Sequence, residues 1–297
     1  MAEQKCAFVA ILGAPNAGKS TLLNHIIGSK ISIVSPKVQT TRGKVRGIFI
    51  KDNTQLILVD TAGIFKPSCR LDRAMVAGAW TESDDADMRL VLVDATKGLD
   101  NNTNLIIQNL TKTKKRAILA INKIDQVTPT KLATLATQIG QMELWDAVFY
   151  VSAKTGKGIP AMMDFLCTKA TTSPWLFDSD EMTDMPDRLF AAEVTREKLF
   201  MNLKNELPYH LTVETTAFKE AEKSIRIEQN IIVERAANRM IILGRGGQMI
   251  KKIGQQSRLE LTKQLHKKVS LFLFVKVREN WAEDPTQYKP WGLDFNA

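Results

Sequence analysis

The chain has 297 residues, of which 44% are hydrophobic and 25% are charged, as in water-soluble globular proteins. No apolar run approaches the ~20 residues that span a bilayer, and the first residues lack a signal-peptide pattern, so we expect neither a membrane-spanning nor a secreted protein. The formal net charge of +9 indicates a polyanionic partner, either nucleic acid or anionic lipid. The three cysteines follow no disulfide or metal-ligand spacing, which favours a reducing cytoplasm.

Residues 1–170 alternate short apolar runs with helical patterns. We expect strands at 7–12, 46–51, 55–60, 88–94, 116–121 and 147–151, and helices that begin at Lys19, Leu71, Asn101, Pro129 and Gly158. This alternation is typical of an α/β domain with a mostly parallel, doubly wound sheet. Such sheets bind ligands at the carboxyl ends of their strands, so the residues at these ends are the first candidates for a site.

A glycine-rich loop follows the first predicted strand. It comprises Gly13, Ala14, Pro15, Asn16, Ala17, Gly18, Lys19 and Ser20, and it reads G-x-x-x-x-G-K-S. The strand, loop and following helix would gather backbone N–H groups around a phosphate at a helix N-terminus. Lys19 would reach the β- and γ-phosphates, and the Ser20 hydroxyl would bind Mg²⁺.

Three further motifs stand at the ends of later strands. They are Asp60-Thr61-Ala62-Gly63, Asn122-Lys123-Ile124-Asp125 and Ser152-Ala153-Lys154. Asp60 can hold the Mg²⁺ shell, and the N–H of Gly63 can reach a γ-phosphate. Asp125 can accept from the two donors on the N1 and N2 edge of guanine, a pair that adenine lacks. Each motif alone could be a turn, a cap or a polar loop, but their order favours a guanine-nucleotide site.

With these motifs the chain resembles the bacterial P-loop GTPases of the Era type. The resemblance implies that residues 36–42 form switch I and that Thr41 closes over Mg²⁺ when GTP is bound. It implies catalytic roles for Lys19, Thr41, Asp60 and Gly63, and metal ligation by Ser20, Thr41 and Asp60. Expected nucleotide contacts are Gly13, Ala14, Pro15, Asn16, Ala17, Gly18, Lys19, Ser20, Thr21, Asp60, Thr61, Ala62, Gly63, Ile64, Asn122, Lys123, Asp125, Ser152, Ala153 and Lys154.

Two positions bear on turnover. Ala62 stands where the family usually has proline, which should loosen the loop but leave binding intact. Ile64 stands where Ras-like enzymes carry a water-orienting glutamine, so we expect slow intrinsic hydrolysis. Asn16 occupies the position at which related GTPases bind K⁺, and we hypothesise that K⁺ stimulates turnover.

The pattern changes after residue 170. Residues 171–187 are acidic and punctuated by proline, which is typical of an irregular surface linker. We then expect a helix at 188–206, strands at 211–218 and 224–234, helices at 236–243 and 248–267, and a strand at 269–277. This order, around a G-x-x-G loop, looks like a smaller α+β domain of the type II KH class, in which the loop clamps about four nucleotides of single-stranded RNA. The predicted division is 1–170 for the GTPase domain, 171–187 for the linker and 188–297 for the KH domain.

The G-x-x-G loop is the candidate RNA site. Its expected RNA contacts are Gly244, Arg245, Gly246, Gly247, Lys251 and Lys252. The glycines would permit close approach of the RNA backbone, and the cations would face phosphates at a helix N-terminus. The motif could instead be a helix C-cap, and the basic helix a solvated face. The resemblance favours RNA, and it implies binding to the 3′ end of 16S rRNA and a role in assembly of the 30S subunit. It also implies a cytoplasmic monomer with peripheral contact to the inner membrane.

Three other functions stay open at this point. The chain could be a GTP-gated peripheral membrane protein that binds anionic lipid. It could be a GTPase-gated RNA-modifying factor, although His210 and His266 have no cysteine partners nearby in the sequence. It could also be a binding scaffold with an inert GTPase domain.

Overall fold

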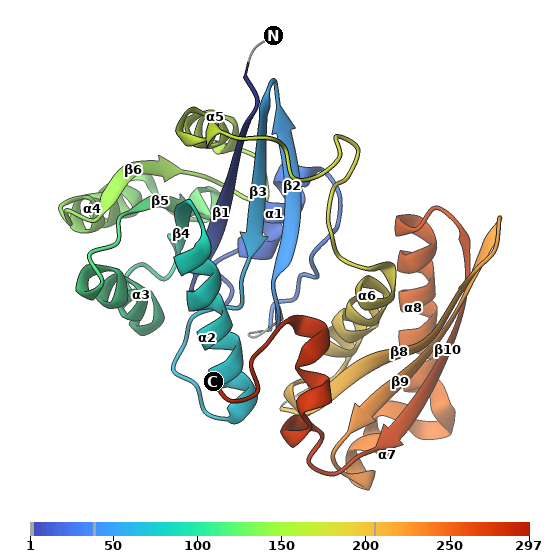
Figure 1. Ribbon diagram of the computed structural model, residues 1–297. Coiled ribbons are helices and arrows are strands. Elements are labelled where there is room, and N and C mark those ends of the chain that lie inside the picture. Colours follow the sequence, from blue (N-terminus) through green and yellow to red (C-terminus); the bar gives the residue numbers. More distant parts are fainter. Residues whose placement is uncertain (1–2, 38–39, 205) are drawn as a thin grey trace. The chain divides into compact units, whose positions relative to one another are not determined.

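The computed structural model describes residues 3–37, 40–204 and 206–297. It divides into two compact units (Figure 1). The first unit comprises Met1–Ser32, Thr41–Asp184 and Trp291–Ala297, and the second comprises Ile33–Thr40 and Met185–Pro290. The chain therefore passes into the second unit once before residue 41 and returns to the first unit at its C-terminal end.

The first unit is built on a 7-stranded sheet. Its strands are β1 (Lys5–Gly13), β2 (Val45–Lys51), β3 (Thr54–Asp60), β4 (Met88–Asp94), β5 (Ala117–Asn122), β6 (Trp145–Tyr150) and β7 (Thr171–Thr172). The main order is β2-β3-β1-β4-β5-β6, in which only β2 runs antiparallel to its neighbour. β1 lies at the centre, where the strand order reverses, and this is the position at which doubly wound sheets bind ligands.

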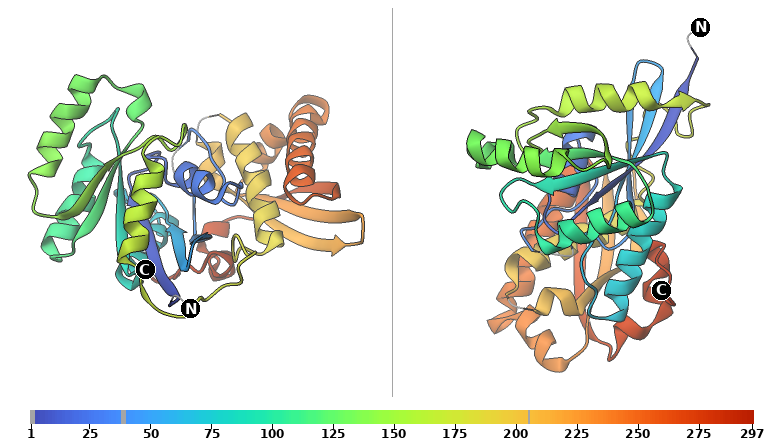
Figure 2. Two further views of the ribbon diagram at one scale, coloured as in Figure 1. Left: turned by 90° about the horizontal axis from the view of Figure 1, so that it is seen from above. Right: turned by 90° about the vertical axis from the view of Figure 1, so that its left-hand side faces the viewer.

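Helices cover both faces of this sheet, as Figures 1 and 2 show. They are α1 (Lys19–Ile27), α2 (Arg70–Asp85), α3 (Asn101–Lys112), α4 (Pro129–Gly140) and α5 (Ile159–Lys169). The helices begin within one residue of the predicted positions, and side-chain caps mark the starts of α3 and α4. The Asp100 side chain accepts from the N–H of Thr103, and Thr128 caps α4 ahead of Pro129. The predicted mostly parallel α/β sheet is confirmed.

The stretch predicted to be an irregular linker is hydrogen-bonded to three strands of the first unit, β1, β3 and β2. Thr171 and Thr172 form β7, which pairs antiparallel with β1. The Gln55 side chain accepts from the N–H of Leu176 at 2.9 Å, and the carbonyl of Met182 accepts from Ile48 at 3.0 Å. The expectation of a stretch without strand structure was therefore wrong at β7, where sheet pairing outweighs a weak local preference.

The second unit has a 3-stranded sheet in the order β10-β9-β8. Its elements are α6 (Asp187–Asn202), β8 (Leu211–Glu220), β9 (Ser224–Val233), α7 (Ala236–Leu243), α8 (Gln248–Gln264) and β10 (Lys268–Val277). β10 is parallel to β9 and β8 is antiparallel to it. Apolar residues of α6 and α8, such as Leu199 and Ile253, share a core with Ile231 and Val233 of β9. The predicted small α+β domain is confirmed, although α6 and α8 end a few residues earlier than expected.

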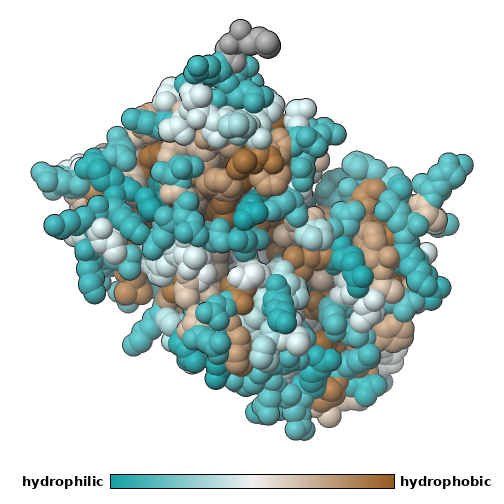
Figure 3. All heavy atoms as spheres, viewed as in Figure 1, coloured by the Kyte–Doolittle hydropathy of each residue, from teal (hydrophilic) through white to brown (hydrophobic). Residues whose placement is uncertain are grey.

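The surface is mainly hydrophilic on the face drawn in Figure 3, with apolar side chains in small patches. Within the described ranges, no helix combines the length and the apolar character needed to cross a membrane.

Candidate nucleotide site and nucleic-acid interface

The glycine-rich loop lies between β1 and α1, and its lysine, Lys19, donates hydrogen bonds to carbonyl groups of the same loop. Gly18, at the N-cap of α1, has φ of 103°, a left-handed conformation that glycine adopts without strain. The Lys19 ammonium donates to the carbonyls of Gly13 at 3.0 Å and Ala14 at 3.2 Å. The loop therefore holds a cation at the helix N-terminus, where the helix dipole also favours an anion.

Burial controls the charge of Lys19. Removal from water lowers its pKa from 10.5 to about 8, and the nearby Asp60 carboxylate partly opposes this shift. A desolvated ammonium interacts strongly with a phosphate that replaces its lost hydration. The electrostatics of the loop thus suit the phosphates of a nucleotide.

Three hydroxyl groups converge on Asp60 at the end of β3. Its Oδ2 accepts from Ser20 at 2.7 Å and from Ser32 at 2.9 Å, and the Ser20 and Thr41 hydroxyls lie 3.1 Å apart. Burial raises the pKa of Asp60, while Lys19 and the hydroxyl groups oppose that rise. Its other oxygen, Oδ1, is buried and has no hydrogen-bond partner among the described residues.

This oxygen cluster fits Mg²⁺. The predicted ligands Ser20, Thr41 and Asp60 provide hard oxygen donors, and the buried Oδ1 is an acceptor that a cation would satisfy. Ser32 joins the cluster although the sequence analysis did not single it out. A lone serine in a loop carries no motif, and only the fold brings it to Asp60.

The Asp60–Gly63 loop packs directly on the glycine-rich loop. A Cβ added at Gly63 would lie 3.0 Å from the Pro15 backbone, so only glycine fits without displacement. The N–H of Ile64 donates to the Gly13 carbonyl at 3.1 Å, while its side chain is buried in the core with Leu12 and Val91. The Ile64 side chain therefore points into the core and cannot orient water, while the predicted contact of this residue with the nucleotide stays a prediction.

Asn122 connects three of the predicted motifs. Its amide nitrogen donates to the Ala17 carbonyl at 2.8 Å, and its amide oxygen accepts from the N–H of Ala153 at 2.9 Å. Asn122 is 1% exposed, so both bonds are shielded from water. The nucleotide contact predicted for Asn122 stays a prediction, and the structure adds a second role, a brace between the phosphate loop and the loop at 152–154.

Asp125 remains exposed beside this brace. A hydrogen bond from Ser152 is the main cause that holds the pKa of Asp125 below its ordinary value. The carboxylate therefore stays ionised at neutral pH and can accept two hydrogen bonds. Its neighbour Lys123 has φ of 64° and donates to Asp94 at 2.6 Å, which fixes the direction of the loop. Lys154 is exposed on the next loop.

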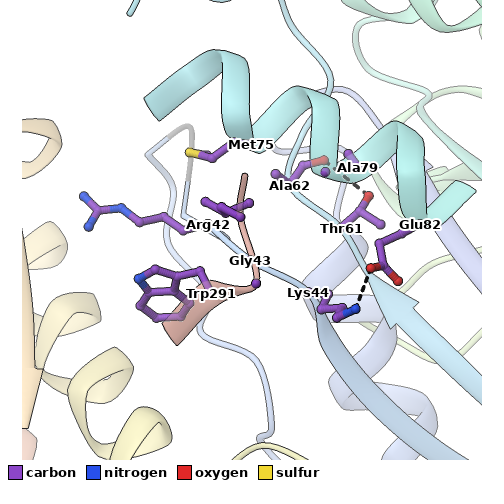
Figure 4. Close-up of a pocket in the computed structure, with 12 residues that line it drawn as sticks. Arg42, Gly43, Lys44, Thr61, Ala62, Met75, Ala79, Glu82 and Trp291 are labelled. Carbon is purple, nitrogen blue, oxygen red and sulfur yellow. Dashed lines mark hydrogen bonds and ion pairs between the residues drawn. The ribbon is translucent and has the colours of Figure 1, made fainter. Parts of the chain in front are cut away.

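A small cavity of about 20 Å³ lies next to Ala62 (Figure 4). Residues from Arg42 to Lys44, α2 and the C-terminal segment line it, and Lys44 pairs with Glu82 at 2.7 Å. A Cβ at Gly43 would lie 2.5 Å from the Trp291 carbonyl oxygen, so the C-terminal segment packs closely on the irregular segment between Thr41 and β2. Ala62 is 3% exposed, which means that its loop is packed despite the missing proline.

The predicted switch I divides between the two units at Thr41. Val38 and Gln39 lie outside the described residues. Within the second unit, the Arg196 guanidinium of α6 donates to the Thr40 carbonyl and pairs with Glu193, and Glu197 accepts from the N–H of Val34 at 2.9 Å. Charged residues of α6 thus hold the segment that leads directly into Thr41, a contact that no sequence motif indicates.

The G-x-x-G loop in the second unit joins α7 to α8. Gly244, Gly246 and Gly247 all have positive φ, between 58° and 75°. A Cβ at Gly244 would lie 2.7 Å from that of Met249, whereas Gly246 and Gly247 face open space. The loop therefore needs glycine on conformational grounds and leaves its outer side accessible to another backbone.

A groove of about 490 Å³ adjoins this loop. Its lining residues are Ile250, Lys251, Gly254, Gln255, Arg258, Leu271 and Leu273. Gly254 is a mid-helix glycine, which costs about 1 kcal/mol relative to alanine but leaves the wall of the groove open. Arg245, Lys251 and Lys252 are exposed and form no ion pair within the described ranges. An apolar floor with unpaired cations beside it suits a single-stranded nucleic acid.

Comparison with known families identifies both units. The model of the 50S ribosome-binding GTPases matches residues 8–123, and the model of the KH domain matches residues 206–282. GTPase Era of Brucella suis biovar 1 is 47% identical over 294 residues, which cover 99% of this chain and 94% of the relative. GTPase Era of Afipia carboxidovorans is 49% identical over 292 residues, with 98% and 95% coverage.

Two solved structures are similar over nearly the whole chain. One is Era in complex with MgGDPNP and nucleotides 1506–1542 of 16S ribosomal RNA, with a TM-score of 0.91, 36% identity, and coverage of 97% of this chain and 99% of that one. The other is a variant of Aquifex aeolicus Era bound to GDP and AlF4⁻, with a TM-score of 0.91, 35% identity and the same coverage.

Proposed function

The chain belongs to the Era family of GTPases, and we propose that it hydrolyses GTP to control binding to the 3′ end of 16S rRNA during assembly of the 30S subunit. The observation that carries this proposal is the presence, in one chain, of a braced phosphate loop and an accessible G-x-x-G loop beside a basic groove. A relative of the same architecture binds both MgGDPNP and this part of 16S rRNA. We assign GTP to residues 1–170 and RNA to 188–297, with 171–187 as the connection.

Backbone N–H groups and charged side chains would recognise the nucleotide. The backbone N–H groups of residues 13–18 and the Lys19 ammonium would bind its phosphates, and the N–H of Gly63 would meet the γ-phosphate. The ionised Asp125 would accept from N1 and N2 of guanine, while the backbone at 152–154 flanks the base. Asn122 would act indirectly, by holding these loops together.

Ser20, Thr41 and Asp60 would hold Mg²⁺. When bound, Mg²⁺ would neutralise charge on the β- and γ-phosphates. The three side chains hydrogen-bond to one another, so the fold brings the oxygen donors together. Thr41 would respond to the γ-phosphate, because it lies in the chain between the hydrogen-bonded cluster around Asp60 and the segment at 33–40.

Hydrolysis would be slow in the absence of an activator, because Ile64 is buried in the core. Asn16, in the left-handed region with φ of 64°, stands in the phosphate loop, and we propose that it binds K⁺, which would supply the missing positive charge. Turnover measured in KCl and in NaCl at equal ionic strength tests this role. Equal rates in the two salts would contradict it.

Coupling to RNA would run through α6. Arg196 holds the carbonyl of Thr40, and Thr40 is joined by a peptide bond to Thr41. A change at Thr41 on hydrolysis would therefore act on a helix that packs in the core of the KH sheet. This gives the γ-phosphate a covalent and hydrogen-bonded path to the RNA-binding unit.

Binding to a short RNA from the 3′ end of 16S rRNA tests the RNA half of the proposal. Gly246→Asp should abolish binding and leave GTP binding intact, because it places a carboxylate where phosphate must approach. Lys251→Ala with Lys252→Ala should weaken binding and reduce its salt dependence, whereas Lys263→Ala, in the last turn of the same helix, serves as the matched control. Loss of GTP binding in the Gly246→Asp variant would contradict the division into two functional parts.

We further propose that the protein acts as a cytoplasmic monomer. As an alternative to RNA binding, the net positive charge of the protein would bind anionic lipid at the inner membrane. Sequence-independent RNA binding that disappears with salt, together with binding to anionic vesicles, would support the membrane alternative. Selective RNA binding that persists in salt would contradict it.

A further inference from the structure

The sheet of the second unit carries two exposed phenylalanines on the face opposite its helices. Val269, Leu271, Leu273 and Val275 of β10 pack toward the core formed with α6 and α8. Successive side chains of a strand point to opposite faces, so Phe272 and Phe274 project away from these helices. They are 42% and 50% exposed. Large aromatic side chains usually have a smaller exposed fraction than this, so the exposure of the two rings indicates a binding surface.

The surroundings of the two rings are polar and basic. The Arg226 guanidinium lies over the ring of Phe272, 4.6 Å from its centroid, and donates to Glu228 at 2.9 Å. Strand alternation places Lys268 and Lys276 on the same face as the phenylalanines. Flat aromatic surfaces flanked by cations are the features with which proteins stack the bases and neutralise the phosphates of single-stranded nucleic acid.

This face adjoins the groove beside the G-x-x-G loop. β10 is an edge strand and pairs only with β9 within the described sheet. Leu271 and Leu273 of β10 line the groove, whereas Phe272 and Phe274 lie on the other side of the same strand. A strand of RNA that leaves the groove across this edge would therefore reach the two rings within a few nucleotides.

We propose that Phe272 and Phe274 form a second RNA-binding surface, on which bases outside the segment held by the G-x-x-G loop stack. The inference rests on the proposed RNA-binding function. The occupant is single-stranded RNA, because the face combines two exposed aromatic rings with the cations of Arg226, Lys268 and Lys276. The G-x-x-G loop clamps about four nucleotides, so only a longer RNA would use this surface.

RNAs of two lengths distinguish binding in the groove from binding at the surface formed by Phe272 and Phe274. One RNA contains only the roughly four nucleotides that the G-x-x-G loop clamps, and two longer ones add about seven nucleotides on the 5′ or the 3′ side. We expect the Phe272→Ala/Phe274→Ala variant to bind the short RNA as the wild type does. It should bind one of the longer RNAs about 10- to 100-fold more weakly, as expected for the loss of one or two stacked bases.

Further variants distinguish stacking from packing. Phe272→Tyr/Phe274→Tyr should retain the affinity for the longer RNA, since tyrosine keeps the ring, whereas Phe272→Leu/Phe274→Leu should lose it. Leu259→Ala is the matched control, because Leu259 is a 60% exposed apolar residue on α8 outside the groove lining. Arg226→Gln should reduce the salt dependence of binding to the longer RNA.

The outcomes separate this inference from the proposed function. Unchanged binding of all three RNAs by the alanine variant would overturn the inference, and so would full retention by the leucine variant. Equal weakening for the short and long RNAs would also overturn it, since the phenylalanines would then only support the groove. Failure of the wild-type protein to bind any of the RNAs would contradict the RNA-binding function itself.

Discussion

Replacing Lys19 with methionine should change how stability depends on pH. Burial lowers the pKa of Lys19 from 10.5 to about 8. An unfolded lysine keeps its proton up to about pH 10.5, so between these values the unfolded state binds more protons than the folded state. Stability therefore rises with pH in this window, and the destabilising effect of the buried cation is fully present below pH 8.

The size of the effect follows from the pKa. Raising the pH from 7 to 9 takes Lys19 from mostly protonated to about one-tenth protonated in the folded state. The free energy of unfolding of the wild type should therefore rise by about 1.4 kcal/mol relative to Lys19→Met over this range.

Urea unfolding at pH 7 and pH 9, without nucleotide or Mg²⁺, measures this difference. The transition of the first unit is the one that added GDP moves to higher urea in the wild type. Lys112→Met, which removes an exposed lysine on α3, is the control and should follow the wild type at both pH values. If Lys19→Met differs from the wild type by the same amount at pH 7 and pH 9, the argument that Lys19 is a desolvated cation is refuted.

Three other substitutions test separate parts of the site. Asp125→Asn should weaken GTP binding by about 100-fold or more and abolish the preference for GTP over ATP, because it removes a charged hydrogen-bond acceptor. Competition binding between GTP and ATP measures this change. Retained preference for GTP would contradict the assignment of Asp125 to guanine recognition. Asn122→Ala removes two buried hydrogen bonds and should destabilise the first unit by about 2–4 kcal/mol in thermal unfolding, whereas an unchanged Tm would argue against a brace. Arg196→Gln frees the Thr40 carbonyl and should slow Mg²⁺-dependent hydrolysis about tenfold while GDP affinity stays the same. Arg188, also on α6, donates to the carbonyl of Thr215 on β8, so Arg188→Gln is the control and should leave hydrolysis unchanged. Equal losses in the two variants would contradict a specific role of Arg196.

The fold was largely predictable because its signals are local. Gly28 ends α1 in the left-handed conformation, and Thr128 with Pro129 begins α4, so caps and periodicity define the elements of the first unit to within a few residues. The motif residues also follow strand ends in the sequence, and parallel strands bring those ends to one edge of the sheet.

Contacts between residues far apart in the sequence could not be predicted in this way. Asn122 donates to the carbonyl of Ala17, 105 residues away, a bracing contact that the motif alone does not indicate. Arg196 holds Thr40 from a helix that reads in the sequence as an ordinary amphipathic element. Ser32 and Trp291 carry no motif, and only packing brings Ser32 to Asp60 and Trp291 to Gly43.

RNA binding in the two nucleotide states is the most direct test of a GTP-controlled RNA-binding protein. A labelled strand from the 3′ end of 16S rRNA and a scrambled strand of equal length would be titrated with the protein in GDP and in a non-hydrolysable GTP analogue, over a series of salt concentrations. We expect selective binding that strengthens with the analogue and persists in salt. Equal affinity in the two nucleotides, or equal affinity for the two strands, would contradict the account.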